Sequence, residues 1–198
     1  SSKGCAEFIT SSFRDSFFNS KEYRKHKVAV ASVRAGNVIG GGDWSENRLI
    51  PDIIRSITNN APLEIRNLRA TRPWQFVLEP LNGYLILAEN LWKHGPKYAE
   101  GWNFGPNSKD IKPVSYIIEK FTQLWGKKLN LKSGKKIHPH ETNYLKLDCR
   151  KAEARLGWKT KMNLDFALEY TVKWYAKYFQ KENLREFSEL QIENFSRL

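Results

Sequence analysis

The stretch KVAVASVRAGNVIGGGDW, residues 27–44, decides the fold class that this sequence predicts. Its first part, residues 27–33, is a short and almost entirely apolar run that is rich in valine. Such a run is typical of a strand that is buried on both faces of a parallel sheet. The remainder is a loop with glycine at positions 36, 40, 41 and 42. Because open α/β sheets bind ligands at loops that leave the carboxyl ends of their strands, the stretch predicts both a fold and a site.

Helices and strands alternate on both sides of this stretch. Before it, the apolar residues at 5, 8, 9, 13 and 17 fall on one face of a helix. After it, we expect a helix at 49–57 with Pro51 in its first turn, strands at 62–65 and 73–77, and a helix that starts at residue 79. The inward face of that last helix is expected to contain Leu81, Tyr84, Leu85, Ala88, Leu91 and Trp92.

The second half of the chain continues this alternation on a smaller scale. A strand at 101–106 precedes a helix from Pro113 to Gly126, and residues 142–148 alternate like a strand. Asp148 is placed to cap a short helix that Gly157 ends, and a long amphipathic helix follows at 163–179. Only residues 27–33 read as a buried parallel strand near the start, yet a parallel strand needs parallel neighbours. The order therefore favours an α/β fragment: the last part of a doubly wound sheet with a smaller α/β lobe.

The composition is that of a globular protein. The chain has 198 residues, of which 40% are hydrophobic and 27% are charged, and it has no apolar run of membrane-spanning length. The spacing of Cys5 and Cys149 suggests neither a metal site nor a disulfide framework, so we expect no metal and a cytoplasmic protein. The net charge of +12 suits nucleic acid, an anionic membrane surface or an anionic small substrate, but the basic residues are dispersed and no nucleic-acid-binding motif accompanies them.

Several side chains near the glycine-rich loop are suited to hold an anion. Asn37 can donate its amide hydrogens to a phosphate or sugar oxygen, and Arg48 adds a charge at the positive end of the helix that follows it. Arg66, Arg69 and Arg72 recur around a turn, and Arg72 directly precedes an apolar strand. A glycine-rich surface turn and solvated arginines are the simpler interpretation of each feature alone. Together they favour a cleft for a small molecule that carries a pyrophosphate.

Two other segments contain candidate polar residues. Asn103 lies between two aromatic residues in the strand at 101–106, where a satisfied buried amide is the simpler interpretation. His138, His140 and Tyr144 fall in one segment, and the two histidines have no third ligand within reach. This segment is therefore interpreted as a ligand-contacting loop and not as a metal site.

The order of the short motifs resembles the later half of the extended short-chain dehydrogenase/reductase family. The tripeptide SSK at 1–3 is similar to the end of that family's Tyr-x-x-x-Lys motif, and RAGNV, RPWQFV, WNFGP and ARLGW follow in the family's order. The stretches AGNVIGGGDW and RPWQFVLEPLNGYL are the most specific part of a resemblance that covers nearly the whole chain. It implies a remnant of the NAD-binding Rossmann domain at 1–60 and a substrate-binding lobe, with returning family elements, at 61–198. It also implies that the glycine-rich cofactor-binding half and the motif's tyrosine, four residues before Lys3, are absent from this sequence.

The resemblance assigns roles to residues at the cofactor end of the site. Lys3 matches the catalytic lysine of the motif, which holds the nicotinamide ribose and, as a cation, lowers the pKa of the motif's tyrosine. Ala35 and Gly36 would present their backbone near the nicotinamide. Asn37 matches a loop asparagine near the cofactor and the substrate diphosphate.

The remaining roles concern substrate binding. Arg48 matches the basic residue before the next helix, and Arg72 matches the arginine that binds the nucleotide phosphates. Asn103 matches the asparagine of the following strand. Tyr144 falls near a position that is an arginine in related dehydratases, so a tyrosine there lacks one charge.

The resemblance finally implies a reaction and partners. The implied ligand is CDP-glucose or a related nucleotide sugar, and the implied reaction is a dehydration in which NAD takes a hydride from the sugar and returns it. A homodimer through the opening helix is implied, with no nucleic-acid or membrane partner. Three alternatives stay open: another nucleotide-sugar epimerase or dehydratase of the family, a small basic nucleic-acid-binding module, and a folded core that binds no ligand.

Overall fold

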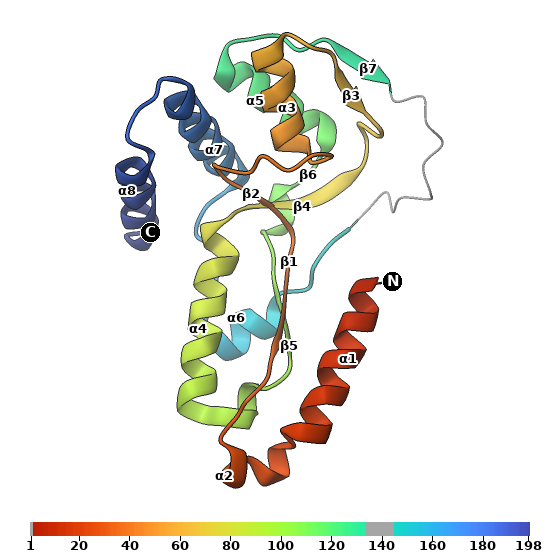
Figure 1. Cartoon of the computed structure of the whole chain (residues 1–198), viewed down its shortest axis with the longest axis vertical. Coiled ribbons are helices and arrows are strands. Elements are labelled where there is room, and N and C mark those ends of the chain that lie inside the picture. Colours follow the sequence, from red (N-terminus) through yellow and green to blue (C-terminus); the bar gives the residue numbers. More distant parts are fainter. Residues whose placement is uncertain (1, 134–144) are drawn as a thin grey trace. The chain divides into compact units, whose positions relative to one another are not determined.

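The computed structural model of the chain describes residues 2–133 and 145–198, and it confirms an α/β fold with parallel strand pairs (Figure 1). Three of the four strand pairings are parallel: β1 with β5, β2 with β4, and β3 with β7. The fourth, between β4 and β6, is antiparallel. The chain divides into two compact units, each assembled from three segments of the sequence.

The first unit comprises residues 1–35, 79–105 and 147–159. Its two-stranded parallel sheet pairs Ser32 with Gly101 and Ala35 with Phe104. A core of large aromatic side chains, including Trp102, Phe104 and Trp158, packs beside this sheet. Its elements are α1 (Ser2–Phe17), η1 (Ser20–Glu22), α2 (Tyr23–His26), β1 (Ser32–Ala35), α4 (Leu78–His94), η2 (Gly95–Tyr98), β5 (Gly101–Phe104) and α6 (Arg150–Leu156).

The second unit comprises residues 36–78, 106–146 and 160–198 and contains the larger core. Its strands β2 and β4 carry Ile39, Trp74 and Phe76 into that core, where they meet the apolar faces of α3, α5 and α7. Its elements are β2 (Asn37–Ile39), α3 (Leu49–Asn59), β3 (Leu63–Ile65), β4 (Thr71–Phe76), η3 (Ser108–Asp110), β6 (Ile111–Pro113), α5 (Val114–Trp125), β7 (Leu131–Ser133), α7 (Leu164–Phe179) and α8 (Leu184–Ser196).

Local sequence signals account for several helix ends. Asn163 caps α7, since its side-chain oxygen accepts from the Phe166 backbone N–H at 3.0 Å. Gly126 and Gly157 end α5 and α6 at φ values of 77° and 68°, which glycine adopts without steric cost. Asp148 was expected to cap α6, and its carboxylate does accept from the Arg150 backbone N–H at 3.0 Å, although the N-cap position itself is Cys149, which makes no side-chain cap hydrogen bond.

The strand expected at 27–33 is wrong in its position and its burial. Strand β1 begins at Ser32, and Val33 within it is 39% exposed. Among the described residues β1 pairs only with β5, so the apolar run before it has no ladder to join. The strand expected at 142–148 is also wrong for its described part, residues 145–148, because their backbone makes single bonds, such as Leu145 N–H to Thr71 O at 3.4 Å, and no ladder.

The inward face predicted for α4 is wrong in part: Tyr84 and Leu91 are partly buried against the aromatic core, but the other four predicted residues are exposed. The residues of α4 that are buried are Glu79, Pro80, Gly83 and Leu87. Leu85 is 72% exposed and Trp92 is 89% exposed. A Cβ atom at Gly83 would lie 2.3 Å from the Phe104 ring, so the glycine allows α4 to approach β5 on a face that periodicity alone did not select.

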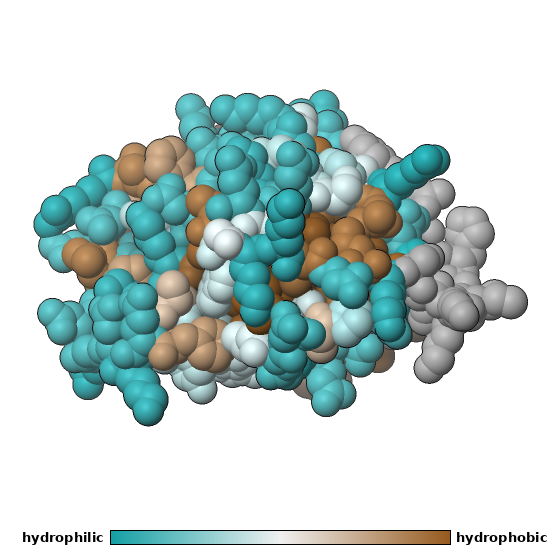
Figure 2. Space-filling view, turned by 90° about the horizontal axis from the view of Figure 1, so that it is seen from above, coloured by the Kyte–Doolittle hydropathy of each residue, from teal (hydrophilic) through white to brown (hydrophobic). Residues whose placement is uncertain are grey.

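One face of the molecule is drawn in Figure 2, coloured by hydropathy. The face drawn in Figure 2 carries mostly hydrophilic side chains, with apolar side chains in separate patches. Among the described residues, no helix is long and apolar enough to cross a membrane.

Candidate functional site

The glycine-rich loop leaves β2 in the second unit and leads into α3. A Cβ atom at Gly41 would lie 2.0 Å from Cγ of Trp174, so only glycine can occupy this position without a shift of the loop or of the ring. Gly42 has a φ of 78°, in the left-handed region that side chains disfavour. The glycines therefore let the loop lie directly on α7.

Two side chains that sequence reasoning missed hold the backbone of this loop. The Tyr175 hydroxyl donates to the Asp43 carbonyl at 2.6 Å. The Arg55 guanidinium donates to the carbonyls of Trp44 and Ser45, each at 3.0 Å. Since each of these contacts goes to a backbone carbonyl, which every residue has, the sequence carries no signal for them.

Arg48 lies at the end of the loop as the N-cap residue of α3, as its position in the sequence predicted. Its Nη1 contacts Oδ2 of Asp43 at 3.3 Å, and the Arg48 side chain is 66% exposed. Burial alone would raise the pKa of Asp43. Hydrogen bonds with Ser45 and the charge of Arg48 lower this pKa by more than burial raises it, so it lies below the ordinary value. The pair therefore places an arginine head in solvent at the start of a helix, where the helix dipole also favours an anion.

Arg72 lies in β4, beside the start of β2. Asn37 pairs with Trp74 in the parallel ladder, and a Cβ atom at Gly36 would lie 2.3 Å from the Pro73 carbonyl oxygen. The structure thus brings Gly36 and Asn37 next to the segment that carries Arg72. Nη1 of Arg72 donates to the Thr71 carbonyl at 3.0 Å. The strand behind it is fixed, because the Trp74 indole is buried and donates to the Lys112 carbonyl at 3.0 Å.

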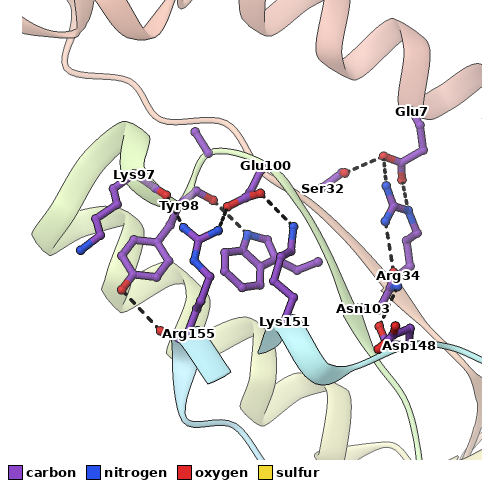
Figure 3. Close-up of polar contacts among 12 residues, drawn as sticks. Glu7, Ser32, Arg34, Lys97, Tyr98, Glu100, Asn103, Asp148, Lys151 and Arg155 are labelled. Carbon is purple, nitrogen blue, oxygen red and sulfur yellow. Dashed lines mark hydrogen bonds and ion pairs between the residues drawn. The ribbon is translucent and has the colours of Figure 1, made fainter. Parts of the chain in front are cut away.

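The first unit contains the other predicted site residues. Lys3 is an exposed residue in the first turn of α1, and it makes no hydrogen bond or ion pair within the described part of the chain. Ala35 is the last residue of β1. Asn103 lies in β5, where its Oδ1 accepts from Arg34 at 3.1 Å and its Nδ2 donates to the Asp148 carbonyl at 3.0 Å (Figure 3).

An open hollow of about 490 Å³ adjoins Asn103 in this unit. It is lined by Asn103, Asp148, Arg150 and Lys151. The amide of Asn103 already has a partner at both ends, so its polar atoms serve the network in Figure 3 in this structure. Its role in substrate binding stays a prediction.

A second polar cluster in the first unit surrounds Glu100. Its carboxylate accepts from Lys151 at 2.9 Å and also from Arg155 (Figure 3). Both cations lie over the Trp102 ring, at 4.6 Å for Lys151 Nζ and 5.1 Å for the Arg155 guanidinium carbon. Burial alone would raise the pKa of Glu100. The hydrogen bonds and charges of the two cations lower this pKa by more than burial raises it, so the carboxylate stays charged. The cluster joins α6 to β5 and is interpreted as structural.

Three of the sequence-based candidates cannot be placed. Tyr144, His138 and His140 lie outside the described residues. Within residues 2–133 and 145–198, no group of three or more His, Cys, Asp or Glu side chains could hold a metal ion.

Comparisons with known proteins agree with the fold and with the family resemblance. No family model matches the chain. It is 50% identical, over 194 residues, to CDP-glucose 4,6-dehydratase of Salmonella typhimurium strain LT2; the match covers 98% of this chain but 54% of that protein. The chain therefore spans about half the length of this curated relative.

Solved structures of nucleotide-sugar enzymes have the same fold. UDP-glucuronic acid 4-epimerase from Bacillus cereus, in complex with UDP-glucuronic acid and NAD, is similar with a TM-score of 0.65 and 18% identity, over 76% of this chain and 46% of its own. The dTDP-glucose 4,6-dehydratase from Bacillus anthracis strain Ames, in complex with NAD, is similar with a TM-score of 0.61 and 19% identity, over 79% of this chain and 48% of its own. The chain is thus related, across almost its whole length, to about half of a CDP-glucose 4,6-dehydratase, and it has the extended short-chain dehydrogenase fold of the nucleotide-sugar epimerases and dehydratases.

Proposed function

We propose that this chain is the nucleotide-sugar-binding part of a CDP-glucose 4,6-dehydratase, a lyase that converts CDP-glucose to CDP-4-keto-6-deoxyglucose and water. The observation that carries the proposal is the 50% identity to that enzyme over 98% of this chain. The glycine-rich loop and Arg72 lie in the part of the sequence that carries the resemblance most specifically. Two free cysteines, one of them exposed, suit a reducing compartment such as the cytoplasm.

The substrate diphosphate is assigned to the arginines of the second unit. Arg72 extends from a fixed strand start beside Gly36 and Asn37, and its guanidinium can bind two phosphate oxygens at once. Arg48 offers a second, exposed guanidinium at the N-terminus of α3. The net charge of +12 adds a general attraction for a nucleotide diphosphate.

The residues of this chain fit NAD in part. The structural relatives named above were solved in complex with NAD. In this chain Lys3 has an exposed ammonium group with no partner among the described residues, so it is available to donate to a ribose hydroxyl. The sequence contains no glycine-rich fingerprint for the pyrophosphate of a dinucleotide, so that half of the cofactor needs residues that this chain does not supply.

On this proposal the chain's own residues bind and orient the substrate and part of the cofactor, but they do not complete the reaction. NAD, when bound, supplies the reversible removal of a hydride at C4 of the sugar and its return at C6. Lys3 would hold the cofactor's ribose. Arg72 and Arg48 would hold the substrate diphosphate and so orient the nucleotide sugar on the second unit. Because the tyrosine partner of Lys3 is not in this sequence, we expect no dehydratase turnover by the 198-residue chain alone.

A homodimer through α1 is part of the proposal. α1 has no buried residue, and Phe8, Ile9, Phe13 and Phe17 on it are 77%, 67%, 51% and 65% exposed. A contiguous exposed apolar face of this kind marks an interaction surface. A second copy of the chain can cover it symmetrically with the same face.

Calorimetric titration of the chain with CDP-glucose tests the proposal. We expect saturable binding with one site per chain that survives an increase in salt better than binding to heparin does, because a bidentate site depends less on counterion release than a diffuse patch. Binding to heparin with a steep salt dependence and no heat with CDP-glucose would instead favour the nucleic-acid-binding alternative. Tighter binding of UDP-glucose than of CDP-glucose in the same assay would instead favour another nucleotide-sugar epimerase or dehydratase of the family.

A further inference from the structure

The face of α1 that lies toward its own unit is polar. Its half-buried residues are Glu7, Thr10, Ser11 and Arg14, which recur at helical spacing, and its apolar residues face away. No residue of α1 is buried. The position of the helix on its unit therefore depends on polar contacts and not on apolar packing.

Glu7 makes the strongest of these contacts. Its carboxylate accepts from Arg34 twice, at 2.7 Å from Nε and 2.6 Å from Nη2, and from the Ser32 hydroxyl at 2.7 Å (Figure 3). Ser32 and Arg34 are two residues apart in β1 and thus point to the same face of the strand. A bidentate carboxylate–guanidinium contact fixes the relative orientation of its two side chains as well as their distance.

Arg34 is itself held in place on β5. Its Nη1 donates to Oδ1 of Asn103 at 3.1 Å, and Asn103 donates on to the Asp148 carbonyl at 3.0 Å. A Cβ atom at Gly101 would lie 2.5 Å from Nη2 of Arg34, so the guanidinium fills the space beside that glycine. Glu7 therefore binds a cation that the sheet has already oriented.

A second contact sets the direction of α1. Nη1 of Arg14 donates to the Ala99 carbonyl at 2.9 Å, just before β5 begins. Ser32 pairs with Gly101, so Ala99 lies at the amino end of the sheet, while Glu7 binds further along β1. The helix thus runs opposite to β1 (Figure 1), and residues before Glu7 lie toward the carboxyl end of the strand. Lys3 is one turn before Glu7, about 6 Å along the helix axis.

We propose that Glu7 and Arg34 are positioning residues that hold Lys3 at the carboxyl end of β1, where Ala35 lies. The role of Lys3 toward a cofactor rests on the proposed function, but its placement by this ion pair does not. Neither Glu7 nor Arg34 need touch the cofactor or the sugar. They act by fixing both the rotation of α1 and its position along the strand.

A distance measurement between spin labels tests the placement directly. One label is attached at Lys3→Cys and the other at Ala88→Cys on α4, in a Cys5→Ser background. The buried Cys149 stays unlabelled, because burial raises the pKa of its thiol to about 11. Glu7→Gln and Arg34→Met remove the ion pair, Arg34→Lys keeps the charge, and Glu89→Gln, which removes an exposed ion pair of the same unit, is the control.

The labelled chain is diluted with an excess of unlabelled chain, so that only distances within one chain are measured. We then expect a single narrow distance distribution in the parent chain and at least a twofold broader one in Glu7→Gln and Arg34→Met. Arg34→Lys should restore part of the narrow distribution, and Glu89→Gln should leave it unchanged. Hydrogen exchange should accelerate at least tenfold in α1 alone, with α4 and α7 unaffected. An unchanged distribution in Glu7→Gln, equal broadening in the control, or equal acceleration in all three helices would overturn the proposal. Because no ligand is present, the result does not depend on whether CDP-glucose or NAD binds.

Discussion

Replacement of Gly41 by alanine is expected to destabilise the second unit through one identified collision. The new Cβ would lie 2.0, 2.1 and 2.6 Å from Cγ, Cδ2 and Cδ1 of Trp174. The ring cannot yield freely. Its Nε1 donates to the Ser188 hydroxyl at 3.0 Å, and it stacks on Tyr178 with ring centroids 6.0 Å apart.

The expected cost of Gly41→Ala is about 2 kcal/mol in the free energy of unfolding. Overpacking of a well-packed site costs about 1–3 kcal/mol. A shift of the indole also loses its hydrogen bond to Ser188, which contributes about 1 kcal/mol. If the collision is the cause, Gly41→Ala in a Trp174→Ala background should cost less than about 0.5 kcal/mol, which gives a coupling of more than about 1 kcal/mol between the two positions.

Urea denaturation followed by circular dichroism measures this cycle. Gly4→Ala in α1 is the matched control, because nothing lies within 4 Å of a Cβ atom there and alanine favours a helix. An equal cost of Gly41→Ala with and without Trp174 would refute the reasoning. So would a cost below about 0.3 kcal/mol in the parent chain, since the loop would then be free to move away from α7.

Three further predictions concern binding, assembly and pH. If the chain binds CDP-glucose, Arg72→Ala should weaken binding by about ten- to a hundredfold, or about 1.4–2.8 kcal/mol. Arg72→Lys should recover part of this loss, and Arg69→Ala should change the affinity little. Calorimetry measures all three variants, and equal losses for Arg69 and Arg72 would indicate a diffuse basic patch. Light scattering should show a dimer that Phe13→Ser with Phe17→Ser converts to a monomer, and a parent chain that stays monomeric at high concentration would refute assembly through α1. Hydrogen bonds from Arg34 lower the pKa of Glu7. The contribution of Glu7 to the docking of α1 is therefore complete above the ordinary glutamate pKa of about 4.3 and is lost as pH falls through the lowered value. The distance distribution of the label at residue 3 should broaden in that acidic range and not at alkaline pH.

The sequence predicted the order of elements better than their limits. The apolar periodicity of α3 and the glycines at the ends of α5 and α6 are local signals, and they were confirmed. β1 was misplaced because valine-rich residues at 27–31 satisfy the pattern of a buried strand whether or not a neighbouring strand is available to pair with them. Strand pairing is a property of two distant segments, and one segment alone does not reveal it.

Part of the candidate site could also be predicted from local sequence signals, and part could not. Glycine spacing and an arginine before an apolar strand are visible in the sequence, and the structure places Gly36 and Asn37 beside the strand of Arg72. The contacts of Tyr175 and Arg55 with loop carbonyls were invisible, because a backbone carbonyl is present at every residue and carries no sequence signal. Residues that bind through side chains are thus easier to predict than residues that hold a loop.

α1 shows why an amphipathic pattern identifies a face but not its partner. The usual assumption, that the apolar face points to the helix's own core, would place Phe13 and Phe17 inside, yet they are 51% and 65% exposed. The inward face is instead the one that carries Glu7 and Arg14, whose bonds to β1 and to Ala99 fix the helix. A helix that is held by an ion pair and a hydrogen bond on one side and is apolar on the other can keep its position whether or not a partner covers its apolar face. Such an arrangement lets assembly through α1 leave the placement of Lys3 unchanged, so the label distribution at Lys3 should be the same in the parent chain and in the Phe13→Ser, Phe17→Ser variant.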